Sequence, residues 1–426
     1  IAIGFLAVII STIGSYCPGL NGPFVFDDLP NILLPQALKI TTLDLNALKT
    51  AAFWEQNQAI GRPIAMLSFA LNYYFGGLAP FGYKLVNLVI HLINGAAIYW
   101  LTLLLVRRVH TGHLNSSKNA THWLALAVSA AWLLHPLNLT SVLYVVQRMT
   151  SLATFFILLG LLGYLWGRRQ LQQDKAVGFV TISLSLLLGT TLSVVTKEIG
   201  VLLPAYALLI ELILYRFTDV GRFSSALRKY WAALTSLGVA AIVTAIAVYP
   251  EKLLSLLNYQ YRDFTLTERL LTESRALWFY IKSIFLPNIS DLGLYHDDFP
   301  ISTSLATPPT TAIAVAGLAI LLVLVFVFIR RAPILAFGIA WFLVGHSIES
   351  TIIPLELIHE HRNYLPQYGL LFALIYYLTY PADRLHATLS LRRGVAVLYI
   401  LLLGLSTYSR ATDWGSELTL YQREVE

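Results

Sequence analysis

The sequence contains few charged residues, and this shortage excludes an ordinary soluble domain. Only 12% of its 426 residues are Asp, Glu, Lys or Arg, whereas 57% are hydrophobic. Ordinary soluble domains carry about 25% charged residues. The single cysteine, Cys17, excludes an internal disulfide framework and any metal site built from several thiolates. The composition therefore predicts an all-α polytopic membrane protein.

Hydrophobic runs long enough to cross about 30 Å of hydrocarbon recur along the chain. We predict eleven spans, near residues 1–17, 82–106, 122–137, 141–166, 177–195, 199–215, 231–249, 311–329, 334–353, 367–380 and 394–409. We expect these spans to form a single integral-membrane domain over residues 1–426. Because the first residue is isoleucine, we expect the first span to lack its natural start.

The basic residues predict how the chain is oriented in the membrane. Fifteen Lys and Arg residues, against three acids, occur in the five loops 107–121, 167–176, 216–230, 330–333 and 381–393. Such residues accumulate in short cytoplasmic loops, so we predict that these five loops are cytoplasmic. The net charge of +6 comes from scattered loops and forms no continuous stripe, so nucleic acid is not an expected partner.

The predicted opposite face receives two long loops, 18–81 and 250–310. The amphipathic stretches 43–49, 62–74 and 267–285 in these loops predict helices that lie in the membrane interface. A membrane-crossing helix over 267–285 is rejected because its five charged side chains would enter hydrocarbon at a cost of a few kcal/mol each.

Four groups of polar residues fall on this predicted non-cytoplasmic face. They are Asp27 and Asp28 with Arg62; His135 and Arg148; Lys197 and Glu198; and residues 356–366, which include His359, Glu360, His361, Arg362 and Tyr364. Burying ionisable groups near a membrane is expensive unless they have partners or face a wet cavity. Their common location therefore predicts a polar cavity.

Each group also has a structural alternative. Asp27 and Asp28 could be a solvated pair that caps a short helix, and Lys197 with Glu198 could be an ion pair in a tight turn. Arg148, expected about two turns into its span, could extend towards lipid head groups. His135 before a proline could be a helix stop. His91 and His346, within predicted spans, are expected to form hydrogen bonds inside the bundle.

The combination of cations and carboxylates suits one kind of chemistry. Arg and Lys stabilise the charge that develops on a phosphate leaving group. An aspartate can remove the proton from an attacking hydroxyl group. In-line attack assisted by one such base inverts the configuration at the anomeric carbon of the sugar. Because phosphate is a good leaving group, no second carboxylate is needed as a general acid. The cavity could thus receive an anion that carries a lipid tail.

Several motifs occur in a characteristic order along the chain. They are Phe24-Val-Phe-Asp-Asp28, Arg62-Pro63, Leu67-Ser-Phe-Ala-Leu-Asn-Tyr73, Pro80-Phe-Gly-Tyr-Lys-Leu-Val-Asn-Leu-Val-Ile-His91, His135-Pro136, Lys197-Glu198 and Glu360-His-Arg-Asn-Tyr-Leu-Pro366. From about residue 20 to 420, the chain resembles the membrane half of the transmembrane and tetratricopeptide-repeat O-mannosyltransferases and their bacterial relatives. These enzymes belong to the GT-C class of polyprenyl-phosphate-sugar glycosyltransferases. Residues 410–426 resemble the junction into the family's repeat region, the start of a C-terminal periplasmic extension.

This resemblance implies a GT-C-like bundle and roles for individual residues. The catalytic base maps to Asp27 or Asp28, and we favour Asp27. Donor-phosphate contacts map to Arg148, Lys197 and Arg362, with Arg62, His135, Glu198, Glu360, His361 and Tyr364 as supporting residues. Eukaryotic members place Glu directly before Arg in the last motif, whereas His361 intervenes here.

The resemblance also implies the partners and location. His361 fits a bacterial branch, with undecaprenyl phosphate as carrier and an active site on the periplasmic face of the inner membrane. The acceptor hydroxyl would belong to a protein or an envelope glycan. No cofactor is required, although paired acids could bind a divalent metal. A transporter or flippase for lipid-linked sugars, and an inert scaffold, are the alternatives.

Overall fold

A computed structural model of the chain describes residues 1–54, 61–109, 118–380 and 386–425. The helices of these ranges are α1 (Ala2–Tyr16), α2 (Leu45–Ala52), α3 (Pro63–Gly76), α4 (Pro80–Val109), α5 (Lys118–Leu133), α6 (Leu139–Leu143), α7 (Arg148–Gln172), α8 (Val177–Val194), α9 (Leu203–Leu209), α10 (Ser224–Val248), α11 (Pro250–Leu256), α12 (Leu266–Phe285), α13 (Thr310–Phe328), α14 (Pro333–Gly345), α15 (Gln367–Thr379), α16 (His386–Asp413) and α17 (Glu417–Val425). No strand occurs in these ranges.

The predicted fold class, an all-α polytopic membrane protein, is confirmed. Within the described residues, eight segments are long and apolar enough to cross a membrane, and a ninth is possible if the bent pair Asn119–Leu133 and Pro136–Leu143 is one span. Together they match nine of the eleven predicted spans. The other two coincide with α14 and α15, which have 13 residues each and are only about 20 Å long.

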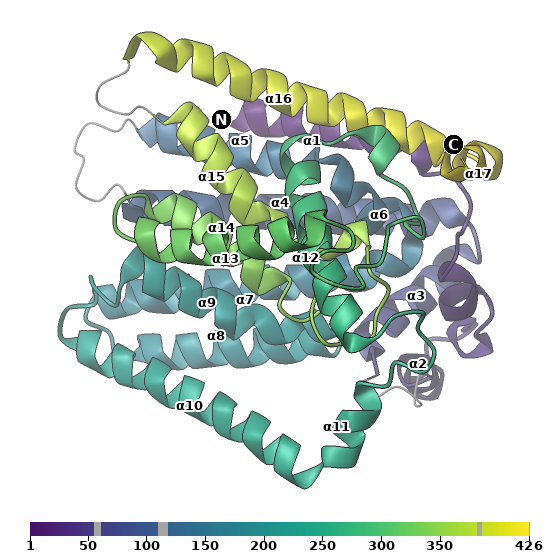
Figure 1. Cartoon of the computed structure of the whole chain (residues 1–426), viewed down its shortest axis with the longest axis horizontal. Helices are drawn as coiled ribbons and strands as arrows, with labels where there is room; N and C mark the ends of the chain where they lie inside the picture. The colour runs from purple at the N-terminus through teal and green to yellow at the C-terminus, as the bar shows by residue number, and fades with distance from the viewer. Residues whose placement is uncertain (55–60, 110–117, 381–385, 426) are drawn as a thin grey trace.

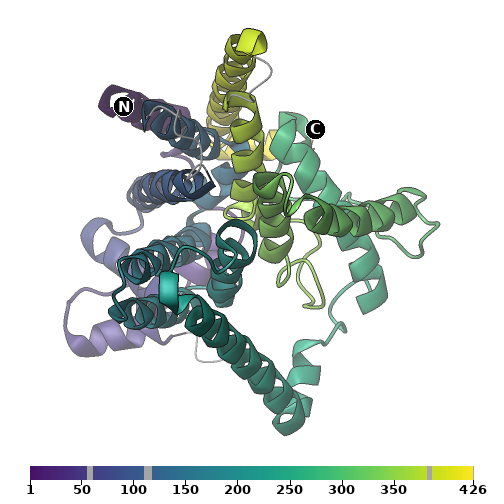
Figure 2. The same cartoon turned by 90° about the vertical axis from the view of Figure 1, so that its left-hand side faces the viewer.

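The long helices run side by side, with the predicted site at one end of the bundle. In Figure 1, α2, α3, α6 and α17 lie at the right-hand end, whereas the connection from α9 to α10 lies at the left-hand end. Helix α12 runs across the direction of the bundle (Figures 1 and 2). Helices α10 and α13 have few buried residues and project from the main body in Figure 2. We call the right-hand end of Figure 1 the site end. We call the left-hand end, where the α9–α10 connection carries Arg216 and Arg222, the basic end.

The stretches predicted to lie in the interface are helical, as expected. Helix α2 begins after Asp44, whose carboxylate accepts hydrogen bonds from the first turn, and α3 begins with Pro63. Thr265 and Glu268 form a capping box at the start of α12. Helix α12 is not among the segments apolar enough to cross a membrane, as predicted from its charges.

Two predicted spans are wrong in part. The span over 141–166 is interrupted, because α6 ends at Leu143, Tyr144 is extended, and α7 begins at Arg148. Arg148 is therefore the first residue of α7 and does not lie two turns inside a helix. The span over 334–353 ends at Gly345. The polar residues that follow have partners in the protein interior, and the chain leaves the helical conformation there.

Helices α14 and α15 flank the non-helical segment 346–366 and cross at two glycines. A Cβ atom added to Gly338 would lie 2.5 Å from the main-chain oxygen of Gly369, and one added to Gly369 would lie 2.7 Å from that of Gly338. Small residues let helices in membranes approach this closely. Because 346–366 contains one of the predicted site motifs, this crossing holds both ends of a site segment.

We therefore expect Gly338→Ala to destabilise the protein. The new methyl group would push α14 from α15, at a cost of about 1–3 kcal/mol for overpacking, and would lower the midpoint of thermal unfolding in detergent. Gly394→Ala in α16 is the control, because no atom lies within 4 Å of the position that its new Cβ atom would take. Equal midpoints for the two variants would contradict the close crossing.

Candidate functional site

The two adjacent acids of the first loop have different environments. Asp28 is fully buried, and its carboxylate accepts hydrogen bonds from the main-chain N–H groups of Val25 (3.0 Å) and Val146 (2.7 Å). Burial raises the pKa of Asp28 to about 7, against the opposing effect of the backbone donors and Lys84. Asp28 therefore attaches the first loop to residues 144–150, which we call the α6–α7 junction.

Asp27 is partly exposed and lies at the start of the same junction. Its main-chain N–H donates to the hydroxyl oxygen of Tyr144 (3.0 Å), and its side chain also interacts with this hydroxyl. The preceding Phe26 adopts a left-handed conformation with φ of 44°, which is unfavourable for a bulky residue, and its ring packs against Tyr295. The strained turn thus precedes two adjacent acids, of which Asp27 is partly exposed and Asp28 is buried.

Arg148 occupies the middle of the junction and is fully buried. Its guanidinium donates to Asn87 Oδ1 (2.7 Å) and to the main-chain oxygens of Tyr83 (2.9 Å) and Ser68 (3.1 Å). It also lies 4.8 Å from the ring centre of Phe69. These contacts join α3, α4 and α7. All these hydrogen bonds of Arg148 go to acceptors inside the protein, and its contact with a donor phosphate stays a prediction.

Lys197 lies at the other end of the junction. Its ammonium group donates to Thr150 Oγ1 (3.0 Å) and forms an ion pair with Glu349 (2.9 Å). Lys197 is buried, with 7% of the residue exposed. The junction consequently places the acid Asp27 near Tyr144 and a cation near Thr150.

Arg62 and Glu198 lie beside this cation. The guanidinium of Arg62 binds both carboxylate oxygens of Glu198 at 3.1–3.2 Å, and its Nη1 lies 3.1 Å from the sulfur of Met149. Both charged side chains are partly exposed. The structure thus brings Arg62, which the sequence grouped with Asp27 and Asp28, next to Glu198, the neighbour of Lys197 in the chain.

Arg362 approaches the same region from segment 346–366. Its guanidinium donates to the main-chain oxygens of Leu357 (3.0 Å) and Glu356 (2.6 Å) and lies 3.6 Å from Glu273. The Nε atom of Arg362 is buried and has no hydrogen-bond partner within the described ranges. Arg362 is 4% exposed, so its positive charge lies in the protein interior.

Two histidines of this segment stack on each other between the cations. The rings of His359 and His361 lie 5.0 Å apart with an interplanar angle of 27°. Burial lowers the pKa of His359, and burial together with the charge of Lys197 lowers the pKa of His361 well below its usual value. Both rings are therefore neutral at neutral pH and act as hydrogen-bonding groups.

Three charged residues of this network, Arg269, Glu273 and Glu349, were not among the site residues predicted from the sequence. Arg269 donates to the main-chain oxygens of Glu349 (2.7 Å) and Thr351 (2.8 Å) and pairs with Glu273 one turn later in α12 (2.9 Å). Glu349 lay inside the predicted span 334–353. An acid in a span usually has a function, so this signal was present in the sequence.

The buried network has an excess of positive charge. Three cations, Arg269, Lys197 and Arg362, lie against two carboxylates, Glu273 and Glu349. Burial raises the pKa of Glu273 to about 7, against the effect of Arg362 and Arg269, which increases the excess when this group is protonated. No cluster of three or more potential metal ligands is found in the described part of the chain. The network is suited to binding an anion.

Several predicted supporting residues hold the framework together. Glu360 is fully buried and binds Arg410 through both oxygens, at 2.9 and 3.1 Å; Arg410 was missed in the sequence. The Tyr364 hydroxyl lies 2.8 Å from His91, and Nε2 of His135 lies 2.9 Å from a main-chain oxygen at the end of α12. His91 thus has the internal bonding expected from the sequence.

Helix α17 supports the loop beside Asp27. The carboxylate of Glu424 accepts hydrogen bonds from the main-chain N–H groups of Leu294 (2.8 Å) and Tyr295 (3.1 Å). Tyr295 packs on Phe26, and the next residue, His296, lies 3.9 Å from Glu360. This loop therefore connects the acid side of the site with segment 346–366.

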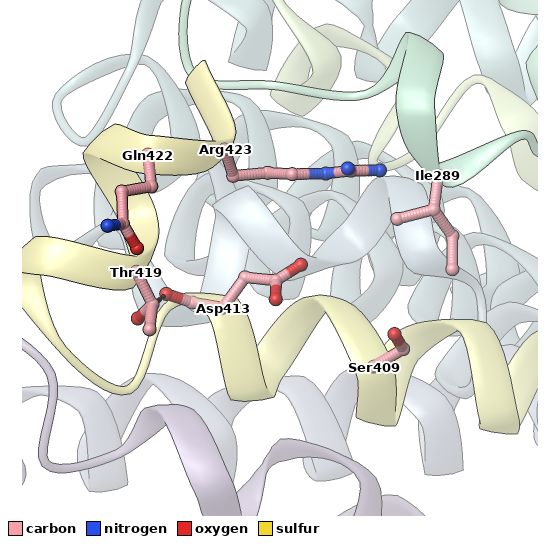
Figure 3. A pocket seen from close by; sticks show the side chains of 6 residues that line it. All are labelled: Ile289, Ser409, Asp413, Thr419, Gln422 and Arg423. Carbon is pink, nitrogen blue, oxygen red and sulfur yellow. Dashed lines mark hydrogen bonds between the residues drawn. The ribbon is translucent and has the colours of Figure 1, made fainter. Parts of the chain in front are cut away.

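A cavity of about 380 Å³ lies next to α17, as Figure 3 shows. Its lining residues are Ile289, Ser409, Asp413, Thr419, Gln422 and Arg423. The carboxylate of Asp413 and the guanidinium of Arg423 extend towards this space. None of the predicted site residues lines it.

The bonding of Asp28 leads to a stability prediction. Asp28→Ala would leave the buried N–H groups of Val25 and Val146 without acceptors, at about 1–3 kcal/mol each, and should lower the midpoint of thermal unfolding in detergent. Asp27→Ala removes the side chain that interacts with the Tyr144 hydroxyl but leaves both buried N–H groups with their acceptor, and should change the midpoint less. Equal losses in the two variants would contradict the anchoring role of Asp28.

The raised pKa of Asp28 predicts a pH dependence of stability. The folded state holds the proton up to about pH 7, whereas the unfolded chain releases it near pH 4. The contribution of Asp28 is therefore fully present below about pH 4 and is lost as the pH rises through 7. Asp28→Asn should reduce this decline between pH 4 and 8 in thermal unfolding; parallel profiles for parent and variant would refute the assignment.

Comparison with known proteins supports the resemblance seen in the sequence. The chain is 30% identical over 175 residues to protein O-mannosyl-transferase Tmtc3 of Drosophila melanogaster, which is 38% of this chain and 19% of that protein. It is 30% identical over 193 residues to human TMTC4, 42% of this chain and 25% of that protein, and 28% identical over 184 residues to human TMTC3, 42% and 18%.

The matches thus span about a quarter or less of these relatives. No family model and no solved structure matches the chain. The predicted resemblance is nevertheless confirmed: over about two fifths of its length, this multi-pass membrane protein is similar to protein O-mannosyl-transferases.

Proposed function

We propose that the chain is an inverting glycosyltransferase that transfers one monosaccharide from a polyprenyl-phosphate carrier to a hydroxyl group. The observation that carries this proposal is the α6–α7 junction, which has a partly exposed acid at one end and a cation cluster at the other. The relatives reported above share the name protein O-mannosyl-transferase. It favours a mannosyl donor and a protein acceptor.

Asp27 is the general base in this proposal. It accepts the proton of the acceptor hydroxyl while the hydroxyl oxygen attacks the anomeric carbon. The bond between that carbon and the phosphate oxygen breaks, and the lipid phosphate leaves with the bonding electron pair. Attack opposite the leaving group inverts the anomeric carbon. Asp28 cannot share this role, because both its oxygens accept backbone hydrogen bonds.

Lys197 and Arg62 bind the leaving phosphate, and the buried Arg362 adds positive charge from the protein interior. Thr150 follows Tyr144 by six residues, which corresponds to about 9–12 Å at the rise of α- and 3₁₀-helices. That length is comparable with one sugar ring and its phosphate. Fixed cations stabilise the charge of the leaving group as it develops, while neutral His361 donates a hydrogen bond to the sugar or phosphate.

The basic end of the bundle supports an orientation. Positive residues accumulate on the cytoplasmic side of membranes, so the site end faces the opposite side. We propose a bacterial inner membrane, a site facing the periplasm and undecaprenyl phosphate as the carrier. The acceptor is then a secreted or membrane protein, or an envelope glycan.

Asp27→Asn tests this function directly. Loss of a general base should reduce transfer by about 10²–10⁴-fold. We expect intact mass spectrometry of envelope proteins and glycolipids to show a mass increase of one sugar with the native chain, and none with a deletion or with Asp27→Asn. Asp44→Asn is the matched control, because Asp44 is an exposed helix cap in the same loop and asparagine caps equally well.

The rival function is transport of lipid-linked sugars. In that case Asp27→Asn would leave the donor on the cytoplasmic leaflet, whereas a transferase defect leaves donor on the outer leaflet. Leaflet location of the donor in the variant separates the two functions. Identical sugar patterns in native, deleted and Asp27→Asn cells would overturn the transferase proposal.

A further inference from the structure

The basic end of the bundle contains a cavity far from the candidate site. It has a volume of about 380 Å³ and lies between the ends of α4 and α7. Arg107 and Arg108 line it from α4, and Arg168 and Arg169 line it from α7. None of the residues proposed for sugar transfer contributes to it, so it requires a separate explanation.

Two of the four arginines are neutralised by neighbouring carboxylates. Arg168 forms a buried ion pair with Glu211 at 2.6 Å, and Arg108 pairs with Asp219 at 2.5 Å. Arg107 and Arg169 are exposed and have no ion pair within the described residues; Nη2 of Arg107 lies 3.0 Å from a nitrogen of His122. The cavity therefore carries about two uncompensated positive charges.

Arg168 provides a second indication of an absent partner. The residue is 1% exposed, and its Nε and Nη2 atoms donate to Glu211. Its Nη1 atom is buried and has no hydrogen-bond acceptor in the described part of the chain. A buried guanidinium nitrogen without an acceptor is costly, and an anion in the cavity that this residue lines could supply one.

The other lining residues are three polar ones, Gln172, Tyr215 and Asp219, and four apolar ones that form one wall of the cavity. Leu104 of α4 and Leu162, Leu165 and Trp166 of α7 line it, and Trp166 is 62% exposed. Both helices are among the segments apolar enough to cross a membrane. Tryptophan is enriched where such helices leave the bilayer. The ligand should therefore combine a negative head with an apolar chain.

We infer that this cavity binds the phosphate group of an anionic membrane phospholipid. The guanidinium groups of Arg107 and Arg169 would contact the phosphate, and the acyl chains would lie along the apolar wall of α4 and α7. Basic pockets between membrane helices bind phosphate head groups in this way. A free phosphate ion has the same charge but gains nothing from the apolar wall.

Native mass spectrometry of the purified full chain in detergent tests this inference, with phosphatidylglycerol and zwitterionic phosphatidylcholine as probes. The native chain should retain phosphatidylglycerol in preference to phosphatidylcholine. The Arg107→Gln, Arg169→Gln double variant should lose affinity roughly twenty-five-fold, at about five-fold per arginine. Both side chains are exposed, and thermal unfolding verifies that the variant folds.

Arg330→Gln with Arg331→Gln is the matched control. Both arginines are exposed. They directly follow Ile329, whose main-chain oxygen accepts a hydrogen bond from Arg216 near the basic end. The double substitution removes the same charge as the test pair, but neither residue lines the cavity. Its affinity for phosphatidylglycerol should stay within two-fold of native. Equal losses in both pairs, equal retention of the two lipids, or displacement of the lipid by millimolar inorganic phosphate would overturn the inference.

Discussion

The two hydrogen bonds that Asp28 accepts from Val25 and Val146 are the constraint on which the site depends. They hold the first loop against the α6–α7 junction, where two helices fail to form one continuous span. Once Asp28 is buried, the preceding residue must turn outward, and Phe26 adopts a left-handed conformation to permit it. The partial exposure of Asp27 is therefore a consequence of the burial of its neighbour.

The opposite end of the junction depends on a second fixed element. Helix α12 lies across the bundle and holds segment 346–366 through Arg269, which donates to several of its main-chain oxygens. That contact positions Glu349, which pairs with Lys197. A surface loop alone would leave these charges mobile. The packed ion network keeps them in place before any substrate arrives, which is the arrangement that electrostatic stabilisation of a leaving group requires.

Hydropathy alone predicted most of the membrane helices, because an apolar run of sufficient length has few alternative structures. The sequence also placed Arg62, Lys197, Glu198 and Arg362 in one region, since each follows or precedes a span on the same predicted face. It could not distinguish Asp27 from Asp28, because neighbouring acids differ only in what they contact after folding.

Other parts of the site depend on contacts between distant segments. Arg148 looks like an intramembrane cation in the sequence, yet its guanidinium is used by α3 and α4. Arg410 binds Glu360 across 50 residues of sequence, a pairing that no local pattern reveals. Glu349 was assigned to a span because its apolar neighbours dominated the window.

The most direct test of this account is equilibrium binding of radiolabelled undecaprenyl phosphate to the purified chain. If the cation end of the junction holds the phosphate and the acid end acts only on the acceptor, Lys197→Gln should weaken binding at least ten-fold, while Asp27→Asn should leave it unchanged. Unchanged binding in Lys197→Gln, or an equal loss in Asp27→Asn, would contradict the division of the junction into a phosphate-binding end and a base.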